Sequence, residues 1–259
     1  MSTMIDCTRD TRGVATLWLA RPEKHNALSA GMMTDLQQAA ETLAQDTSVR
    51  VVVLAARGES FCAGGDLAWM RAQFEMDRAT RRRESARIAD VLGALYALPQ
   101  PLIGALQGNA FGGGLGLAAV CDVTLGADHL RMGLTETRLG LIPANIGPYV
   151  VARMGPRHAA EVFMNARIFD AHEAVRLGLL TRAVPGDQLA QALEAEVAPY
   201  LSCAPGAVRA AKALLRRLSG AIDPAQVEAA IDALSDRWET AEAQEGIAAF
   251  FEKRPAPWV

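Results

Sequence analysis

Two glycine-rich segments combine residue types that suit the binding of a negatively charged oxygen. They are residues 61–66, with the sequence FCAGGD, and residues 110–116, with the sequence AFGGGLG. Glycine lets the backbone approach a ligand closely with its N–H groups exposed. If such a loop opens a helix, the helix dipole adds partial positive charge, so the loop can stabilise an oxyanion. For either loop alone, a tight turn or a close packing contact is the favoured interpretation.

The motifs of several other chemistries are missing from the sequence. It contains neither the phosphate-binding pattern GxxxxGK[ST], nor a strict GxGxxG, nor the GxSxG turn of many hydrolases. The four histidines lack HxxxH spacing and the four cysteines lack CxxC pairs, so no metal site is predicted. We expect each histidine to be a surface or structural residue. Any catalysis must then rely on carboxylates and backbone groups.

The elements that must position the two loops form a predicted α/β core. Apolar runs rich in branched residues predict strands at residues 14–20, 49–55, 102–106 and 122–126. Apolar residues at helical spacing predict helices that begin near residue 29 or 31, that span residues 77–98, and that lead from the second glycine loop to about residue 120. The glycine loops therefore follow buried strands and precede helices.

From residue 144 onwards the pattern is almost wholly helical. Breaks are expected at the pairs Gly155-Pro156, Pro185-Gly186, Pro205-Gly206 and Asp223-Pro224. We expect no core strand in the last three quarters of this stretch. The architecture predicted from the residues is an α/β core followed by a helical tail that covers the core or joins subunits.

Length and charge limit the classes of partner. A chain of 259 residues, 51% hydrophobic and 21% charged, predicts one main core. The net charge of −3 argues against a nucleic-acid-binding surface. The one basic run is interleaved with acidic residues at helical spacing, and we interpret it as a solvated helix face rather than an anion site. It comprises Arg78, Arg81, Arg82, Arg83 and Arg87.

Residues 91–121 carry no charged side chain and exceed the ~20 residues that cross a bilayer. Prolines, glycines and amide side chains in this stretch would leave polar groups unsatisfied in lipid, so we reject a membrane span. The first ten residues lack the apolar segment of a signal peptide. Scattered cysteines fit a reducing compartment, and a cytoplasmic location is expected.

An ordered set of motifs lies between Phe61 and Pro143: FCAGGDL, FGGGLG, Cys-Asp and MGLTETRLGLIP. Together with RPEKHNAL at 21–28 and EGIAAFFEKR at 245–254, the set resembles the crotonase, or enoyl-CoA hydratase/isomerase, superfamily over almost the whole chain. The resemblance implies an α/β fold, a crotonase-like spiral of ββα units with a C-terminal helical trimerisation region. It implies a core in residues 1–200, and helices in residues 201–259 that join subunits and complete the coenzyme A (CoA) site. A homotrimer or a dimer of trimers acting on an acyl-CoA thioester is expected.

The resemblance also implies catalytic residues. The two N–H groups that bind the thioester oxygen fall on Gly65 and Gly113, and one such donor is worth roughly 3 to 4 kcal/mol in the transition state. The second carboxylate of typical hydratases matches Glu136, whose pKa we expect apolar neighbours to raise. The first carboxylate has no match, because its position is occupied by Gly116, which can neither hold nor deprotonate water.

A single carboxylate leaves three functions open. Proton transfer between C2 and C4 of an enoyl thioester needs only Glu136, as in isomerases of the family. Against this, residues 64–70 and 142–149 resemble the methylglutaconyl- and isohexenylglutaconyl-CoA hydratase-like branch, which shares the glycine replacement. Hydration of a 2-enoyl-CoA of branched glutaconyl type is therefore favoured, with the substrate's own carboxylate, Asn145 or Asn109 orienting the water. The third function is that of an inactive CoA-ester-binding homologue.

The remaining site residues follow from the same resemblance. No cofactor is expected, because coenzyme A is part of the substrate. Three residues of the early loop are expected near the nucleotide: Lys24, His25 and Ala27. Two residues are expected to line the adenine and pantetheine path: Asp66 and Leu67. Two are expected to reach the CoA of a neighbouring subunit, namely Phe250 and Lys253, and four are expected to shape the acyl pocket, namely Trp69, Met70, Phe74 and Tyr149.

Overall fold

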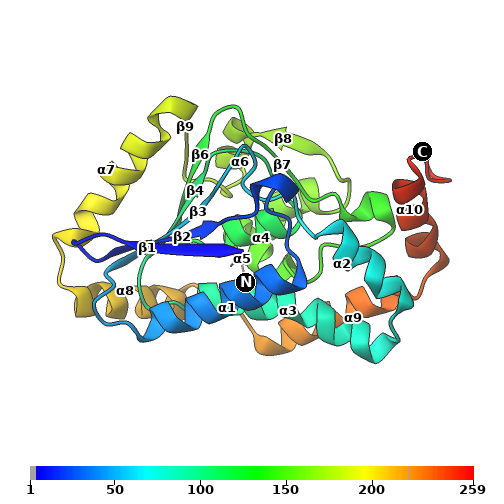
Figure 1. Ribbon diagram of the computed structural model, residues 1–259, viewed down its shortest axis with the longest axis horizontal. Coiled ribbons are helices and arrows are strands. Elements are labelled where there is room, and N and C mark those ends of the chain that lie inside the picture. The colour runs from blue at the N-terminus through cyan, green and yellow to red at the C-terminus, as the bar shows by residue number, and fades with distance from the viewer. Residues whose placement is uncertain (1–3, 221) are drawn as a thin grey trace.

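The main β-sheet of the computed structural model, which describes residues 4–220 and 222–259, has six strands in the order β1-β2-β3-β4-β6-β9 (Figure 1). β1 is antiparallel to β2, and the other neighbours are parallel. The strand bounds are β1 Ile5–Arg9, β2 Val14–Leu19, β3 Val51–Ala56, β4 Leu102–Leu106, β6 Val123–Ala127 and β9 Arg182–Val184. Residues 1–3, in the segment predicted to lack a signal peptide, lie outside the described residues.

A second sheet contains three short strands in the order β5-β7-β8. Their bounds are β5 Ala110–Phe111, β7 Arg131–Gly133 and β8 Ile168–Asp170. The chain alternates between the sheets, because β4 leads into β5 and then into a helix, and β6 leads into β7 and then into a helical turn. This alternation is the ββα repeat that the family resemblance implied, and it confirms the predicted α/β fold class.

Helices surround the sheets. Their bounds are α1 Ala30–Gln45, α2 Leu67–Ala72, α3 Arg78–Tyr96, α4 Gly113–Ala119, α5 Gly147–Phe163, α6 Ala171–Arg176, α7 Leu189–Leu201, α8 Pro205–Leu218, α9 Pro224–Trp238 and α10 Ala241–Glu252. Several helices begin at a residue whose side chain caps the free N–H groups of the first turn. Asp77, for example, accepts a hydrogen bond from Thr80 N at 2.7 Å at the start of α3. In the part of the chain described here, no helix is both long and apolar enough to cross a bilayer.

Strand β3 is buried along its whole length, which explains its run of apolar residues. Val52 and Leu54 belong to the core cluster that includes residues of α1 and α3. Val51 and Val53 belong to a smaller cluster on the opposite face, closed by Val197 of α7. A parallel strand covered on both faces reads as a continuous apolar run, so the predicted strand is confirmed.

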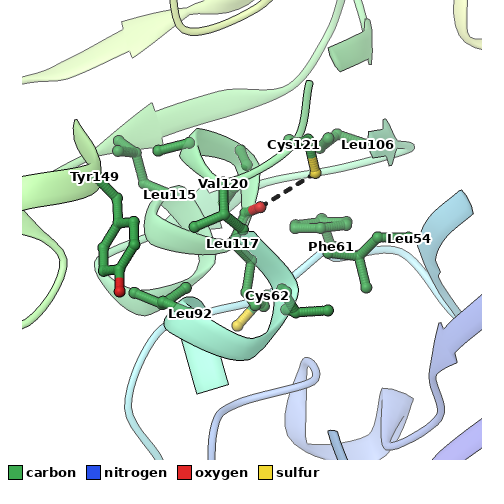
Figure 2. Close-up of a cluster of buried hydrophobic side chains, with 14 of the residues drawn as sticks. Leu54, Phe61, Cys62, Leu92, Leu106, Leu115, Leu117, Val120, Cys121 and Tyr149 are labelled. Atoms are coloured by element: carbon green, nitrogen blue, oxygen red, sulfur yellow. Dashed lines mark hydrogen bonds between the residues drawn. The ribbon is translucent and has the colours of Figure 1, made fainter. Parts of the chain in front are cut away.

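The larger core encloses α4 and the two buried cysteines, Cys62 and Cys121 (Figure 2). Cys121 Sγ donates to Leu117 O at 3.3 Å, one helical turn earlier. Because all seven residues of α4 are buried, the helix can consist only of glycine and small or apolar residues. The glycines at its start therefore lie in a packed environment and not in a flexible linker.

The basic run of α3 is only in part the solvated face that the sequence predicts. Arg78 and Arg83 are exposed, but several of the arginines also form ion pairs with α9 and the residue that follows it. Arg82 bonds Asp232 and Glu228 of α9 at 2.6 Å each, and Arg78 bonds Asp236. Arg81 is 8% exposed and pairs with Glu239. The acidic partners of Arg78, Arg81 and Arg82 lie more than 140 positions later in the chain, so a pattern confined to α3 could not reveal them.

The C-terminal half contains a strand of the main sheet where none was expected. Strand β9 pairs in parallel with β6, from Leu125↔Arg182 to Ala127↔Val184. It is three residues long and only partly buried, so it has neither the length nor the apolar run that identifies a strand. The expectation that this region holds no core strand is therefore wrong.

Candidate active site

Three loops lie side by side because the residues before them pair in parallel register. Cys62 forms a parallel bridge with Ala110, and Ala110 pairs in parallel with Met132. Neighbouring strands lie about 4.8 Å apart, so the segments that continue from these residues remain close. These continuations are the two glycine loops and the turn that contains Glu136. Successive ββα repeats thus bring together residues that are about 70 positions apart in the sequence.

The backbone N–H groups of Gly65 and Gly113 have no hydrogen-bond acceptor among the described residues. Gly65 pairs with Leu28 in a parallel bridge, but the residues on either side of Gly65 make the two hydrogen bonds of this bridge. Leu28 N donates to Gly64 O at 2.7 Å, and Asp66 N donates to Leu28 O at 3.0 Å. Gly113 is the first residue of α4, where an N–H group has no partner within the helix. Both amides are therefore available to a ligand.

The two glycine loops approach too closely to accommodate side chains. Gly64 and Gly112 have φ angles of +97° and +48°, in the region that favours glycine. A Cβ atom on Gly64 would lie 3.1 Å from Phe111 O, and one on Gly112 would lie 2.9 Å from Glu136 Oε1. Both positive φ and close packing thus require glycine at these positions.

Glu136 opens a short helical turn, Glu136–Leu139, beside the second glycine loop. Its Oε2 atom is buried and has no hydrogen-bond partner among the described residues. Burial raises the pKa of Glu136 from 4.5 to about 7, because the charged form loses its hydration. A carboxyl group with a pKa near neutrality can both give and take a proton at physiological pH.

Gly65, Gly113 and Glu136 line one cavity of about 390 Å³. This volume is within the range of small-molecule sites. Most of the wall is apolar, and it includes Met70, Ile88, Leu141, Ile146, Leu234 and Trp238. Two glycines whose amides have no acceptor among the described residues and one carboxyl group therefore border the same largely apolar cavity, where electrostatic interactions are stronger than in water.

Gly116, at the position where the resemblance places the first carboxylate of the family, packs against core side chains. A Cβ atom at this position would lie 2.6 Å from Ile146 Cγ2 and 3.2 Å from Leu92 Cδ1. Ile146 thus fills the space that a longer side chain at residue 116 would need, and it also lines the cavity. A longer side chain at residue 116 would therefore require Ile146 to move.

Four of the predicted binding residues line the cavity: Leu67, Trp69, Met70 and Phe250. The Trp69 indole is held by a hydrogen bond from Nε1 to Glu84 Oε2 at 3.0 Å. Phe250 belongs to α10 and reaches the cavity of its own chain. Its contact with the CoA of a neighbouring subunit remains a prediction.

Two of the four predicted acyl-pocket residues do not line the cavity. Tyr149 is buried in the core (Figure 2). Its hydroxyl group donates to Ala89 O at 3.4 Å, and its ring packs edge-on against Tyr96, so it contacts α3 rather than the cavity. Phe74 packs edge-on against Trp238, and Trp238 contacts the cavity in its place.

The other predicted CoA contacts lie outside the cavity wall. Lys24, His25 and Lys253 are exposed, and Ala27 is buried. Asp66 caps α2 by accepting from Ala68 N at 2.9 Å and Trp69 N at 3.1 Å, and it pairs with Arg21 at 2.7 Å. These assignments remain predictions about a ligand that extends beyond the cavity.

Several cavity residues were not expected from the sequence: Gln73, Ser85, Ile88, Arg138, Leu234 and Trp238. The last two come from α9, whose apolar stripe shows that one face is buried but not against which element. Ser85 is a polar residue within the apolar stripe of α3 and is 1% exposed. Its polar type at a buried helix position is the sequence signal that could have identified it. Among the described residues, no three His, Cys, Asp or Glu side chains are grouped as metal ligands.

The ββα fold and the site together define a crotonase-type enzyme. The Enoyl-CoA hydratase/isomerase family profile matches residues 9–259. A crotonyl-CoA hydratase of Syntrophomonas wolfei is 31% identical over 95% of this chain and 94% of its own length. An enoyl-CoA hydratase structure from Mycobacterium smegmatis is 36% identical with a TM-score of 0.81, covering 99% of each chain. One from Shewanella pealeana is 35% identical with a TM-score of 0.80, covering 98% of this chain and 96% of the other.

This chain belongs to the enoyl-CoA hydratase/isomerase family, which confirms the resemblance found in the sequence. The family identification favours an enzyme over an inactive binding homologue.

Proposed function

We propose that this enzyme adds water to a 2-enoyl-CoA thioester. Two N–H groups, on Gly65 and Gly113, bind the thioester oxygen, and Glu136 transfers the proton. The shared cavity is the observation that carries the proposal, because it lets all three groups reach one substrate. No cofactor is needed, since coenzyme A is part of the substrate and the chemistry uses amides and one carboxyl group.

The charge that develops during the reaction explains the two amides. Attack of water at C3 moves an electron pair through C2 toward the thioester oxygen, which gains negative charge. Each well-aimed donor lowers the barrier by roughly 3 to 4 kcal/mol. The protonated form of Glu136 supplies the proton that C2 takes up, and the pKa of about 7 keeps much of this form present near neutral pH.

We further propose that the acyl group is of the branched glutaconyl type, which carries a second carboxylate. Arg138 lines the cavity two residues after Glu136 and makes no ion pair among the described residues. A guanidinium group can bind a carboxylate through two parallel hydrogen bonds. The resemblance of residues 64–70 and 142–149 to the glutaconyl-CoA hydratase-like branch supports the same substrate class.

Double-bond isomerisation is the second candidate function. It needs one proton-transfer group, and Glu136 is the only carboxylate among the described residues that line the cavity. The apolar packing at Gly116 favours this alternative, because no second carboxylate acts there.

Helix α8 supports the proposed trimer or dimer of trimers. Its polar side faces the core, where Lys212 and Arg216 both pair with Asp122, at 2.6 and 2.9 Å. Its outer side exposes Leu215 and Leu218, which are 63% and 77% exposed. A helix with polar residues inward and leucines outward is expected to be covered by another subunit.

The function is tested with a panel of enoyl-CoA esters that includes crotonyl-CoA and a branched glutaconyl-CoA. Mass spectrometry detects hydration as the gain of one water, and NMR detects isomerisation as a moved double bond. We expect a gain of water, fastest with the glutaconyl ester. A moved double bond without water would establish the isomerase, and no turnover of any ester would contradict both functions.

Glu136→Gln provides the matched control, because it keeps shape and removes the acid. We expect turnover to be abolished with CoA-ester binding nearly unchanged. A variant that keeps more than about a tenth of the wild-type rate would remove Glu136 from the mechanism, since general acid–base groups contribute 10²-fold or more.

A further inference from the structure

The cavity wall contains a second unpartnered acceptor besides Glu136 Oε2. Asn145 is 5% exposed, and its Oδ1 atom is buried without a hydrogen-bond partner among the described residues. A buried polar atom left in this state costs free energy, so it is expected to pair with a bound molecule. Asn145 and Glu136 line the same cavity, which allows one molecule to satisfy both acceptors.

The main chain of α3 fixes the orientation of the Asn145 amide. Asn145 Nδ2 donates to Ser85 O at 2.8 Å. A carbonyl oxygen can only accept, so exchanging the amide N and O would place two acceptors face to face. Oδ1 is therefore the atom that remains for a ligand, on a side chain with little freedom to turn.

Helix α4 places Asn145 and Glu136 at neighbouring parts of the wall. The Cβ position of Gly112 lies 2.9 Å from Glu136 Oε1. The Cβ position of Gly116 lies 2.6 Å from Ile146, the residue that follows Asn145. Gly112 and Gly116 are one helical turn apart, about 6 Å along the axis. Glu136 and the Asn145–Ile146 segment thus approach the same turn from its two ends.

We propose that Asn145 is a positioning residue that, together with Glu136, holds the water that adds to the double bond. This inference rests on the proposed hydration. A water molecule has two O–H donors, so it can bond both acceptors and direct an oxygen lone pair at C3. A hydroxyl group on the acyl chain has one donor and would satisfy only one acceptor.

The protons and electrons of this step balance. The water oxygen bonds to C3 as the C2–C3 π bond opens, and the proton of Glu136 passes to C2. A water proton then passes to the Glu136 carboxylate, which restores the acid for the next turnover. Asn145 neither gains nor loses a proton. An amide thereby replaces the acceptor that typical members of the family supply with their first carboxylate.

The side chains of Ser85 and Asn109 are engaged elsewhere. Ser85 Oγ donates to Gln73 Oε1 at 3.5 Å. Asn109, the other amide considered for this role, does not line the cavity, and its Oδ1 accepts from Arg131 N at 2.8 Å. Of the two amides, Asn145 is therefore the one that keeps a free acceptor on the cavity wall.

The test separates water addition from proton removal. Hydration kcat and KM are measured for wild type, Asn145→Leu and Asn145→Asp with the fastest ester of the panel. In parallel, exchange of the C2 hydrogens of butyryl-CoA with D₂O is followed by NMR. The exchange needs Glu136 and the two amides but no attacking water. Leucine resembles asparagine in shape without its hydrogen-bonding atoms, whereas aspartate keeps an acceptor.

We expect Asn145→Leu to lower hydration kcat at least about 20-fold, with KM and the exchange rate within about threefold of wild type. Asn145→Asp should keep at least about a fifth of the wild-type kcat. Hydration by Asn145→Leu near the wild-type rate would overturn the inference, as would exchange that falls in parallel with hydration. Equal losses in the two variants would also overturn it. A wild type that exchanges C2 hydrogens but hydrates no ester would overturn the proposed function as well.

Discussion

The surroundings of Glu136 raise the pKa of its carboxyl group toward neutrality. Its Oε2 atom has no partner among the described residues, and burial raises its pKa to about 7. Asp66, by contrast, accepts backbone and guanidinium hydrogen bonds, which hold its pKa below the usual range despite partial burial. The two carboxylates lie on neighbouring loops, and their hydrogen bonds decide which one can exchange protons.

The raised pKa of Glu136 predicts a pH-dependent stability. The folded state keeps a proton that the unfolded state releases between pH 4.5 and about 7, so the free energy of unfolding falls as pH rises through this window. Glu136→Gln lacks this titration. We expect it to be more stable than wild type at pH 8 by up to about 3 kcal/mol, and by little at pH 4.5. Urea denaturation at both pH values measures the difference, and an equal difference at both would exclude the raised pKa.

The packing at Gly116 predicts the outcome of restoring the missing carboxylate. Gly116→Glu alone should lose roughly 1 to 3 kcal/mol of stability, because its side chain would overlap Ile146. Adding Ile146→Ala should recover part of that loss and raise crotonyl-CoA hydration above that of the single variant. Thermal unfolding and hydration assays test both effects, with Ile146→Ala alone as the control. A stable, more active single variant would show that the wall is not as rigid as this packing implies.

At the level of elements, the site depends on how α2 and α4 begin. Each helix starts within two residues of a free amide, Gly65 before α2 and Gly113 at the start of α4. Strand register sets the spacing of the loops, and helix starts set the direction of their backbone. The cap of α2 by Asp66 is therefore expected to influence the position of the Gly65 amide.

A pair of cap variants tests this link. Asp66→Ala removes the cap of α2, and Asp77→Ala removes the cap of α3, which starts at an exposed position. Each should cost about 0.5 to 2 kcal/mol of stability, with the higher value for Asp66 because Arg21 also loses its partner. We expect Asp66→Ala to lower kcat/KM about 10-fold or more and Asp77→Ala to leave it nearly unchanged. Equal effects on activity would mean that the cap does not position the amide.

The sequence predicted the strands of the main sheet that form long apolar runs, and the glycine loops after them. It also placed Gly65, Gly113 and Glu136 through the family motifs, and these residues share one cavity. It did not predict β9, which is too short to show a pattern. The resemblance placed Tyr149 in the acyl pocket, whereas its side chain is buried in the core, because a motif does not show whether a helix face meets the core or a cavity.

At the scale of the whole molecule, the C-terminal helices complete the cavity from a distant part of the chain. Trp238 of α9 and Phe250 of α10 line it, and the ion pairs between α3 and α9 hold α9 in place. Helix α10 lies at the opposite end of the molecule from α7 (Figure 1). Helix α8 lies between these regions in the sequence and leaves its leucines exposed.

The exposed leucines of α8 predict assembly. Leu215→Asp combined with Leu218→Asp should convert a trimer or hexamer into monomers, because two carboxylates would be buried in an apolar interface. Arg217→Asp is the control, since it adds negative charge to the same helix outside the leucine stripe. Sedimentation velocity distinguishes the states. A wild type that sediments as a monomer, or a double variant that still assembles, would contradict this interface.

The oxyanion site is tested most directly by a crystal structure of Glu136→Gln with a bound 2-enoyl-CoA ester. We predict that the thioester oxygen lies about 2.7 to 3.1 Å from both Gly65 N and Gly113 N, with the residue 136 side chain beside C2. An ester whose thioester oxygen contacts neither amide, or whose acyl chain occupies another cavity, would contradict the proposed mechanism.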